Sequence, residues 1–540
     1  MSEHPWWRGA VIYQVYVRSF CDSNGDGQGD LPGLMGKLDY IASLGVDAIW
    51  LSPIHPSPDR DWGYDVSDFE NVHRDYGTLE DFHALLEAVH ARGMKLMLDE
   101  VLAHTSDEHP WFADSLKRGD KADWYVWTDA RADGTVPNNW LAVFGGPAWA
   151  YQPARRQYYH HKFLRQQPKL NWRNADARAA ALDVLDLWLE RGVDGFRLDV
   201  ANAYLHDATL TDNPPVEPRD AHAWSHAANM QHHFNDSNLI ENVEALADVR
   251  CVVERYPNRF VMGEFSEEPE LSGCFLAPDE GLHSGYSFPL LEARKLGPEF
   301  IRAHYEMLAR HPEHWPSVAF SNHDVMRTLT RFGGKGAPQA LAKLMLALLF
   351  SLKGTALLYQ GEELGLPQTK LGRDQLRDPV GDLYWPYTSG RDGCRTPIPW
   401  DAGAPNLGFT SGNTWLPLAP EHRTLAVSSQ EQDAHSTLSF AREFLKFRKN
   451  TPALRWGEIE FVDAPAPLLA FTRSYKNERL LCLFNMSADK CVCDLPTGQM
   501  LAMKLGNAKD ADGRLVLGPY ALSFFSNSST PIPSSPGLSG

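Results

Sequence analysis

The chain has few cysteines and no long hydrophobic run. Seven cysteines are spread thinly over 540 residues, and no Cys or His cluster follows the C-x-C pair at 491–493. Neither a disulfide framework nor a zinc site is therefore expected. No stretch of about 18 apolar residues could span a membrane, and the opening MSEHPWWRGA lacks the basic and apolar regions of a signal peptide. We expect a cytoplasmic protein with no membrane partner.

Positive charge is also scarce. Lys and Arg number 51 against 69 Asp and Glu, which gives a formal net charge of −18. Such a chain repels phosphate backbones, so no nucleic-acid partner is expected. A hydrophobic content of 43% and a charged content of 22% are typical of globular proteins.

Short apolar runs of strand type alternate with helix-patterned segments along most of the chain. The runs cover residues 11–17, 46–53, 95–102, 193–200, 260–265, 317–324 and 355–363, with a weaker one at 283–291. Continuous apolar strands separated by helices predict a parallel sheet buried on both faces. About eight such units predict an α/β fold, a closed (β/α)8 TIM barrel.

Breaks in this alternation predict the domain organisation. Residues 1–103 and 176–460 are expected to form the barrel, and residues 104–175, rich in Trp, Asn, Gly and Pro, an inserted subdomain B. Alternating short strands predict a C-terminal antiparallel β domain over residues 461–526. The Ser- and Pro-rich residues 527–540 are expected to be a disordered tail.

Charged residues follow several of the expected strands, where a barrel places its active site. Arg197 and Asp199 lie two apart and so point to the same side, where the guanidinium favours an ionised carboxylate. Glu264 stands beside apolar residues that raise a carboxyl pKa, and His323 precedes Asp324. A lone carboxylate at a strand end is more often part of a buried ion pair. Three from separate strands favour retaining glycoside cleavage.

Four segments carry a family resemblance: DEVLAH (99–104), GFRLDV (195–200), GEF (263–265) and FSNHD (320–324). GYD (63–65), QPKLN (167–171) and RTPIPW (395–400) support it. Over roughly residues 5–525, the chain resembles the α-amylase superfamily, glycoside hydrolase family 13. It is most similar to the α-glucosidase and oligo-1,6-glucosidase branch.

The resemblance implies roles for individual residues. The nucleophile would be Asp199, the general acid/base Glu264 and the transition-state stabiliser Asp324. The glucose at the cleaved bond would be bound by two histidines, a stacking tyrosine and an acidic–basic clamp that closes the pocket: His104, His323, Tyr64, Asp65 and Arg395. Phe163 is a weaker stacking candidate, and Arg197 belongs to the same set. Without the resemblance, each histidine would be interpreted as a residue of the hydrophobic core, and the acidic–basic clamp as a surface salt bridge.

Three positions bear on the branch and on linkage preference. Lys169 gives QPKLN, a mixture of the motifs of two branches, and Ala103 stands where many members have Asn. Val200, directly after the nucleophile, is associated in the family with α-1,6 cleavage. The alternative is an ordinary strand valine.

The loop DSNGDGQGD (22–30) carries oxygen ligands at alternate positions. These are the side chains of Asp22, Asn24, Asp26 and Asp30 and the carbonyl of Gln28. The spacing resembles the first part of an EF-hand, although Gly33 occupies the place of its bidentate Glu. Because the family binds Ca²⁺ at this loop, the resemblance implies structural Ca²⁺, with Mg²⁺ as the alternative ion. Without a cation the loop would be an Asx/Gly turn.

The resulting hypothesis is a retaining, exo-acting α-glucosidase that hydrolyses short α-glucosides and also transfers glucose. Its substrates would be maltose, isomaltose, sucrose or aryl glucosides, and it would act as a monomer or homodimer. One alternative is a sucrose- or trehalose-rearranging enzyme of the same fold. The other is a non-catalytic sugar-binding or transporter-partner relative, although the chain keeps all three carboxylates.

Overall fold

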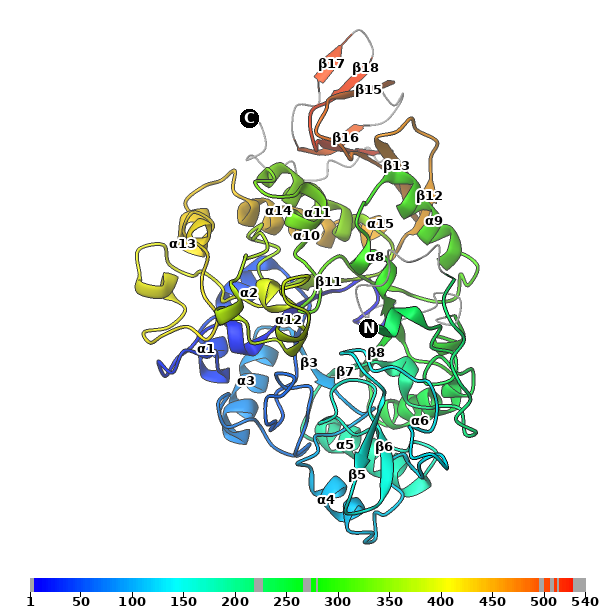
Figure 1. The fold of residues 1–540 in the computed structure, drawn as a ribbon. Coiled ribbons are helices and arrows are strands. Elements are labelled where there is room, and N and C mark those ends of the chain that lie inside the picture. Colours follow the sequence, from blue (N-terminus) through cyan, green and yellow to red (C-terminus); the bar gives the residue numbers. More distant parts are fainter. Residues whose placement is uncertain are drawn as a thin grey trace.

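The computed structural model describes residues 4–217, 227–265, 273–277, 280–494, 500–505, 509–511 and 514–527. A barrel of parallel strands occupies the middle of the molecule, with an inserted region at one end and two antiparallel sheets at the other (Figure 1). The predicted α/β barrel class is confirmed.

Eight strands form the barrel sheet in the order β10-β11-β1-β2-β3-β7-β8-β9. They are β1 (Val11–Val15), β2 (Ala48–Leu51), β3 (Lys95–Glu100), β7 (Gly195–Leu198), β8 (Phe260–Phe265), β9 (Ser284–Ser287), β10 (Ser317–Ala319) and β11 (Thr355–Tyr359). Neighbours in this order pair in parallel, including β1 with β11. Between β9 and β10, side chains bridge the sheet, because the Ser284 and Ser317 hydroxyls lie 2.8 Å apart.

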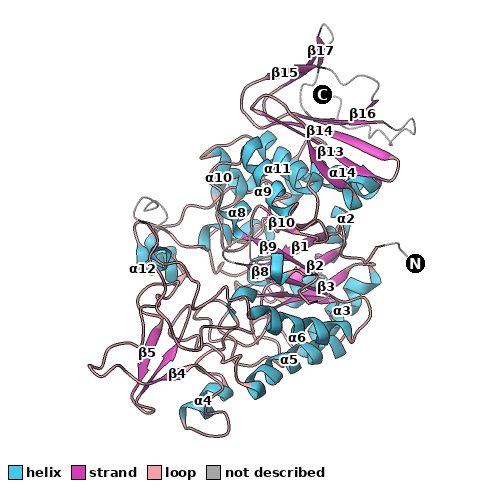
Figure 2. Ribbon diagram, turned by 90° about the vertical axis from the view of Figure 1, so that its right-hand side faces the viewer, coloured by secondary structure: helices cyan, strands magenta, loops and turns pink. Residues whose placement is uncertain are grey.

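Helices cover the outside of the barrel (Figure 2). Along the chain they are α1 (Leu31–Met35), α2 (Leu38–Leu44), α3 (Leu79–Ala91), α5 (Ala175–Glu190), α6 (Asn242–Glu254), α8 (Phe288–Glu292), α9 (Pro298–Leu308), α10 (Thr328–Gly333), α11 (Gln339–Ser351), α12 (Pro379–Tyr384), α13 (Val427–Gln430), α14 (Thr437–Lys449) and α15 (Pro452–Trp456). Polar caps start several of them: the Asn174 side chain accepts from the N–H groups of Asp176 and Ala177 at the start of α5. The helical segment after β1 is divided into α1 and α2 at Gly36 and Lys37.

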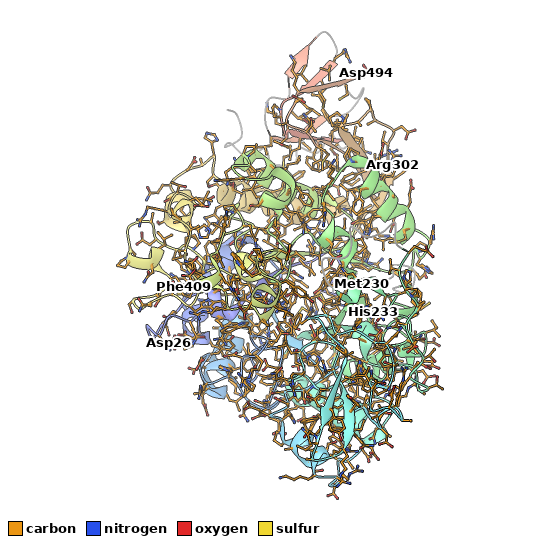
Figure 3. The ribbon with its side chains drawn as sticks, viewed as in Figure 1. Asp26, Met230, His233, Arg302, Phe409 and Asp494 are labelled. Carbon is orange, nitrogen blue, oxygen red and sulfur yellow. The ribbon has the colours of Figure 1, made fainter. Side chains whose placement is uncertain are left out.

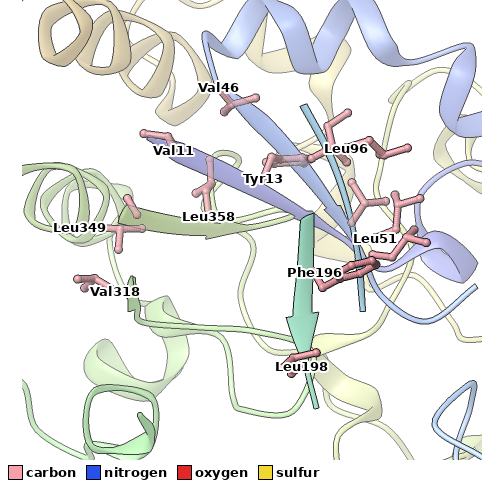
Figure 4. Packing of buried hydrophobic residues seen from close by; sticks show 14 of the residues in the cluster. Val11, Tyr13, Val46, Leu51, Leu96, Phe196, Leu198, Val318, Leu349 and Leu358 are labelled. Carbon is pink, nitrogen blue, oxygen red and sulfur yellow. The ribbon is translucent and has the colours of Figure 1, made fainter. Parts of the chain in front are cut away.

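Alternation along the strands separates two apolar layers. In β1, Val11 and Tyr13 belong to the large cluster between the sheet and the helices, whereas Ile12 belongs to the cluster inside the barrel. The outer layer continues through Leu358 of β11 and Leu349 of α11 (Figure 4). Burial on both faces explains why these strands read as unbroken apolar runs.

The region between β3 and α5 contains its own small elements. α4 (Pro110–Leu116) precedes a three-stranded antiparallel sheet of β4 (Trp127–Thr128), β6 (Gln157–His160) and β5 (Trp149–Gln152). An antiparallel bridge joins His104 to Lys169, so the chain leaves the barrel and returns to it at neighbouring points. We call residues 104–175 subdomain B.

The C-terminal part forms two antiparallel sheets. The larger has the order β12 (Glu458–Phe461), β13 (Leu468–Tyr475), β14 (Glu478–Asn485), β19 (Leu522–Ser526) and β16 (Met500–Leu505). The smaller contains β15 (Cys491–Asp494), β18 (Arg514–Leu517) and β17 (Lys509–Ala511). Most of the tail expected at 527–540 lies outside the described residues.

A search of the described helices for a membrane span finds none that is both long and apolar enough.

Candidate active site

The strand register brings polar side chains to the carboxyl-terminal mouth of the barrel. Met97 and Met262 lie in the interior apolar cluster, and two residues further along the same strands stand Asp99 and Glu264. Asp99 lies opposite Arg197 in the pairing of β3 with β7. The inward side of each strand therefore changes from apolar to charged as it approaches the mouth.

Arg197 connects three carboxylates. Its Nη1 lies 2.6 Å from Asp99 Oδ1 and 2.9 Å from Asp199 Oδ1, and its Nη2 lies 2.5 Å from Glu264 Oε1. The guanidinium is fully buried beneath these carboxylates. Asp199 and Glu264, from β7 and β8, are thus held at the two terminal nitrogens of one side chain.

A left-handed backbone residue links the same two strands. Val200 has φ +38° and ψ +50°, a conformation that a β-branched residue rarely adopts. Its N–H donates to Glu264 Oε2 at 3.1 Å. Strain of this kind persists where the surroundings impose it, and it is often found at functional sites.

The third carboxylate is held from the opposite side of the mouth. Asp324 Oδ1 lies 2.8 Å from Arg395 Nη2 and 3.3 Å from Arg391 Nη1, while Oδ2 lies 3.2 Å from His323 Nε2. Although burial acts against it, the neighbouring positive charges hold the pKa of Asp324 well below its usual range. Asp324 is therefore ionised.

The other two carboxyls have raised pKa values. Burial raises the pKa of Glu264 to about 7, against the lowering effect of Arg197. Burial likewise raises the pKa of Asp199 to about 7, so the guanidinium offsets only part of the desolvation. Around neutral pH the site can supply one carboxylic acid and one carboxylate.

These side chains open into a cavity of about 720 Å³. Its walls come from the barrel loops, from subdomain B and from the loop around α12: Asp61, Tyr64, His104, Val143, Phe144, Lys162, Phe163, Gln167, Asp199, Val200, Ala228, Asn229, His233, Glu264, Phe288, Glu292, Arg294, Asp324, Val380, Thr388, Gly390 and Arg391. A concave site with apolar walls and a few convergent polar groups is typical of small-molecule binding.

The ion pair in the wall of this cavity is not the one expected. Arg391 Nη2 lies 2.6 Å from Asp61 Oδ1, and both residues line the cavity. Asp65 does not line it, because its carboxylate accepts from Ser57 Oγ and from the N–H groups of Arg60 and Asp61. The structure therefore pairs Asp61 with Arg391 in the cavity wall and does not bring Asp65 and Arg395 together there.

Arg395 and His323 stand behind the wall. Arg395 is fully buried and donates to the His323 carbonyl at 2.7 Å as well as to Asp324. Both His323 nitrogens face protein groups, Nδ1 the Gln14 amide at 2.8 Å and Nε2 the Tyr64 hydroxyl at 2.5 Å. Neither residue lines the cavity in this structure, where Arg395 contacts Asp324 and His323 contacts Tyr64.

Of the remaining expected binding residues, Tyr64, His104, Phe163 and Val200 line the cavity, whereas the buried Arg197 does not. The Tyr64 ring stacks on His323 with an interplanar angle of 2°, which fixes its orientation. The His104 ring lies 5.3 Å from that of Phe163. Burial lowers the pKa of His104 to about 4, so this histidine is neutral at physiological pH. Gln167 Nε2 donates to Asp61 Oδ2 at 3.1 Å and to the Tyr64 carbonyl at 3.2 Å.

The acidic loop at 22–30 lies apart from the cavity and forms consecutive turns. Asp22 Oδ1 accepts from the N–H groups of Asn24 and Gly25, and Asp26 Oδ1 from that of Gln28. Asp30 caps α1 through the Gly33 N–H. The carboxylate and amide oxygens of the loop at 22–30 are the kind of ligand that a hard divalent cation prefers. Each of the three carboxylates accepts from backbone N–H groups. Among the described residues, they do not belong to the clusters of three or more His, Cys, Asp or Glu side chains whose ligand atoms lie within 4.8 Å of one another.

A comparison with known protein families matches residues 14–457 to the alpha-amylase catalytic domain. The chain belongs to the alpha-amylase family. A probable alpha-glucosidase of Rhizobium meliloti is 48% identical over 505 residues, which cover 92% of each chain, and an oligo-1,6-glucosidase of Bacillus cereus is 34% identical, covering 92% and 93%.

Solved structures of the family share the whole fold. The alpha-glucosyl transfer enzyme XgtA superposes with a TM-score of 0.94 at 47% identity, covering 97% of this chain and all of its own. The trehalulose synthase MutB of Pseudomonas mesoacidophila MX-45 has a TM-score of 0.88 at 31% identity with the same coverage. The resemblance read from the sequence is confirmed.

The sequence reading missed four residues of this alpha-amylase family site: Asp61, Asp99, Tyr286 and Arg391. Asp99 opens the motif DEVLAH, and Asp61 stands three residues before Tyr64, so both lay inside or beside quoted segments. Tyr286 lies in the weakest of the expected strands, and its hydroxyl accepts from Arg197 Nε at 3.1 Å. Only a contact between distant parts of the chain reveals Arg391, four residues before the motif RTPIPW.

Lys169, the unusual residue of QPKLN, has a structural role. Its ammonium group is buried and donates to the Ala203 carbonyl, in the turn after Asp199. Burial lowers the pKa of Lys169 to about 7. The side chain thereby ties the returning end of subdomain B to the barrel mouth.

Proposed function

We propose that the protein is a retaining α-glucosidase that removes terminal glucose from short α-glucosides and also transfers it to other hydroxyl groups. The observation that carries the proposal is that Asp199 and Glu264 contact the two terminal nitrogens of Arg197 at the cavity. Retention needs the nucleophile and the acid close enough to act on one bond. The relatives named alpha-glucosidase and oligo-1,6-glucosidase support the same activity.

Each catalytic carboxyl would have a separate role. Asp199 attacks the anomeric carbon, while Glu264 protonates the departing oxygen and then deprotonates the attacking water. The raised pKa of Glu264 suits the first of these steps, and the ionised Asp324 favours positive charge on the sugar ring. Tyr64 provides an apolar face for that ring.

The closed side of the cavity supports exo action. Asp61 and Arg391 form an ion pair across it, with Arg391 also 2.8 Å from Asp378. A chain end can fill such a pocket, whereas the middle of a polysaccharide cannot pass through it. We expect maltose, isomaltose, sucrose or aryl α-glucosides as substrates.

A structural divalent cation, Ca²⁺ or Mg²⁺, is part of the proposal. It would be held in the loop at 22–30 by Asp22, Asn24, Asp26, Asp30 and the Gln28 carbonyl, and the alternating oxygen donors support it. The cation would offset the repulsion among three carboxylates.

We further propose a cytoplasmic location and a monomeric or homodimeric state. All seven cysteines are unpaired, as a reducing compartment favours. Cell fractionation and size-exclusion chromatography with light scattering would test the two statements.

The decisive experiment uses p-nitrophenyl α-glucoside with Asp199→Ala and Glu264→Gln. Each variant should lose about three orders of magnitude or more in kcat while keeping the parent melting temperature. Proton NMR of the first product should show α-glucose. Turnover within about tenfold of the parent, or β-glucose as the first product, would contradict the proposal.

Rearrangement of sucrose is the second candidate. The Phe144 and Phe163 rings, both in the cavity wall, lie 5.9 Å apart, and the trehalulose synthase neighbour shares the fold. Product analysis from sucrose decides between the two, because a rearranging enzyme would give isomeric disaccharides with little free glucose.

A further inference from the structure

A buried carboxylate that takes no part in the catalytic group lies beside the cavity. Asp236 is fully buried, and its Oδ2 lies 3.2 Å from Lys162 Nζ and 2.9 Å from His233 Nδ1. Its Oδ1 accepts from Asn213 Nδ2 at 3.1 Å. Lys162 follows β6 in subdomain B, whereas His233 belongs to the long loop after β7, so Asp236 joins two separate parts of the chain.

Asp236 stands one layer behind the cavity wall. Lys162 and His233 line the cavity, but Asp236 does not. The positive charge of Lys162 and the imidazole of His233 together hold the pKa of Asp236 well below its usual range, although burial opposes them. The group is a permanent anion in contact with two residues of the wall.

His233 passes this anchoring on to the backbone of the wall. Its Nε2 lies 3.0 Å from the Ala228 carbonyl oxygen, while Nδ1 faces Asp236. Both partners only accept hydrogen bonds, so the two ring nitrogens of His233 connect the buried anion to the backbone of the wall. Ala228 lies in the short helical turn Ala227–Met230, which contributes Ala228 and Asn229 to the cavity. Figure 3 labels Met230, at the end of this turn, and His233.

This stretch of wall rests on the turn that follows the nucleophile. The Asn238 N–H donates to the Asn202 carbonyl at 2.9 Å, and Asn202 lies three residues after Asp199. On the subdomain B side, the Lys162 carbonyl accepts from the N–H of Val143, another wall residue, at 2.8 Å. We call Val143, Lys162, Ala228, Asn229 and His233 the Asp236-anchored wall. The closing pair Asp61–Arg391 is a separate part of the cavity.

We propose that Asp236 is a positioning residue that holds this wall against the incoming acceptor, and so sets how the glucosyl unit is divided between water and acceptor hydroxyls. The inference rests on the proposed function and deepens it. In the transfer step an acceptor oxygen forms a bond to the anomeric carbon as the carbon–oxygen bond to Asp199 breaks. The acceptor proton passes to the Glu264 carboxylate.

The effect should be specific to the second half of the reaction. An acceptor larger than water must be oriented by the wall, and a wall that shifts loses this orientation. Water needs no such alignment. Replacing the anion by a neutral amide leaves Lys162 and His233 facing each other without compensation, which favours their displacement.

The test is Asp236→Asn with p-nitrophenyl α-glucoside as donor and a range of maltose concentrations as acceptor. Released p-nitrophenol measures the first step, and free glucose against glucosylated maltose measures the partition. We expect kcat/KM for p-nitrophenol release within about twofold of the parent and a transfer-to-hydrolysis ratio at least about fivefold lower, which corresponds to roughly 1 kcal/mol of lost acceptor alignment.

Asp207→Asn is the matched control. Asp207 belongs to the same loop but does not line the cavity, and its carboxylate accepts from the Thr209 hydroxyl and the Thr211 N–H. It should keep both quantities. The variant His233→Gln tests whether the two residues act through one chain of contacts. If they do, the double variant Asp236→Asn/His233→Gln should have a transfer-to-hydrolysis ratio little lower than that of His233→Gln alone.

If a lowered melting temperature shows that Asp236→Asn does not fold properly, the variant Ala228→Val is used to test the inference. This change adds bulk to the wall without touching the buried anion, and it should lower the transfer ratio while p-nitrophenol release persists. An unchanged ratio in folded Asp236→Asn, or in Ala228→Val where the first cannot be used, would overturn the inference. Absence of p-nitrophenol release from the parent protein would instead remove the proposed function.

Discussion

The backbone N–H of Val200 donates to Glu264 Oε2, which places the residue after the nucleophile in direct contact with the general acid/base. The contact requires the left-handed conformation at Val200, and it couples the ends of β7 and β8. Any change at this position therefore acts on both catalytic strands as well as on the cavity, which the valine also lines.

Val200→Thr should change linkage preference. The hydroxyl would replace one methyl group in the wall next to the cleaved bond, while the β-branched shape and the backbone hydrogen bond would be kept. We expect the ratio of kcat/KM for isomaltose to that for maltose to fall by about threefold or more, or roughly 0.7 kcal/mol. Steady-state kinetics on the two disaccharides measure it. A rise in the ratio would contradict the association of valine with α-1,6 cleavage.

The pH profile of kcat/KM should be a narrow bell centred near pH 7. Burial raises the pKa of both Asp199 and Glu264 to about 7. Falling pH protonates Asp199 and removes the nucleophile, while rising pH deprotonates Glu264 and removes the acid. The two limbs should therefore meet near neutrality.

Glu264→Gln separates the two limbs. With 2,4-dinitrophenyl α-glucoside, whose leaving group needs no protonation, the variant should keep the acidic limb of the first step and lose the alkaline one. A persisting alkaline limb would show that another group is the acid.

Asp61→Asn should weaken the closed side of the pocket. It leaves the partly buried Arg391 without one of its carboxylate partners, and breaking a largely buried pair is costly. We expect kcat/KM for maltose to fall by about tenfold or more, close to 1.4 kcal/mol. Asp65→Asn, the same substitution four residues away, provides the comparison. A larger loss from Asp65→Asn would favour the clamp first read from the sequence.

Chelation should lower thermal stability more than activity. A cation bound only by the folded loop at 22–30 stabilises the protein by about 2.7 kcal/mol at a hundred times its Kd. EDTA should lower the melting temperature by several degrees, and Ca²⁺ or Mg²⁺ should restore it, with little change in initial rate at low temperature.

Asp26→Asn is the control for this experiment. It removes one exposed carboxylate of the loop, so the variant should begin with a lower melting temperature and respond less to EDTA. An identical response in parent and variant would place the cation elsewhere, and an unchanged parent melt would argue against it.

Much of the barrel follows from periodicity. The run FVMGEF matches β8 at both ends because its apolar residues are buried on both faces. In the weak run at 283–291, only Ser284–Ser287 form a strand, β9, and α8 begins at Phe288. The run was a weak strand candidate because Ser and Gly have low strand propensity. Three motif carboxylates were located at the mouth because a strand end fixes where its side chains lie.

Contacts between distant parts of the chain could not be read in the same way. Asp61 and Arg391 are separated by 330 positions, and neither forms a local pattern that distinguishes it from a surface charge. Membership of a family motif also did not reveal whether a residue lines the cavity or is buried behind its wall. His323 and Arg395 stand in family motifs, yet both are fully buried, and the residues that they contact, Tyr64 and Asp324, line the cavity in their place.

The pairing of β1 with β11 has a consequence for biosynthesis. The first strand meets its second neighbour only through Thr355–Tyr359, so about two thirds of the polypeptide must leave the ribosome before the ring can close. Until then β1 has an unpaired edge that invites aggregation. Expression yield should accordingly be sensitive to chaperone supply during translation, even for variants whose finished fold is fully stable.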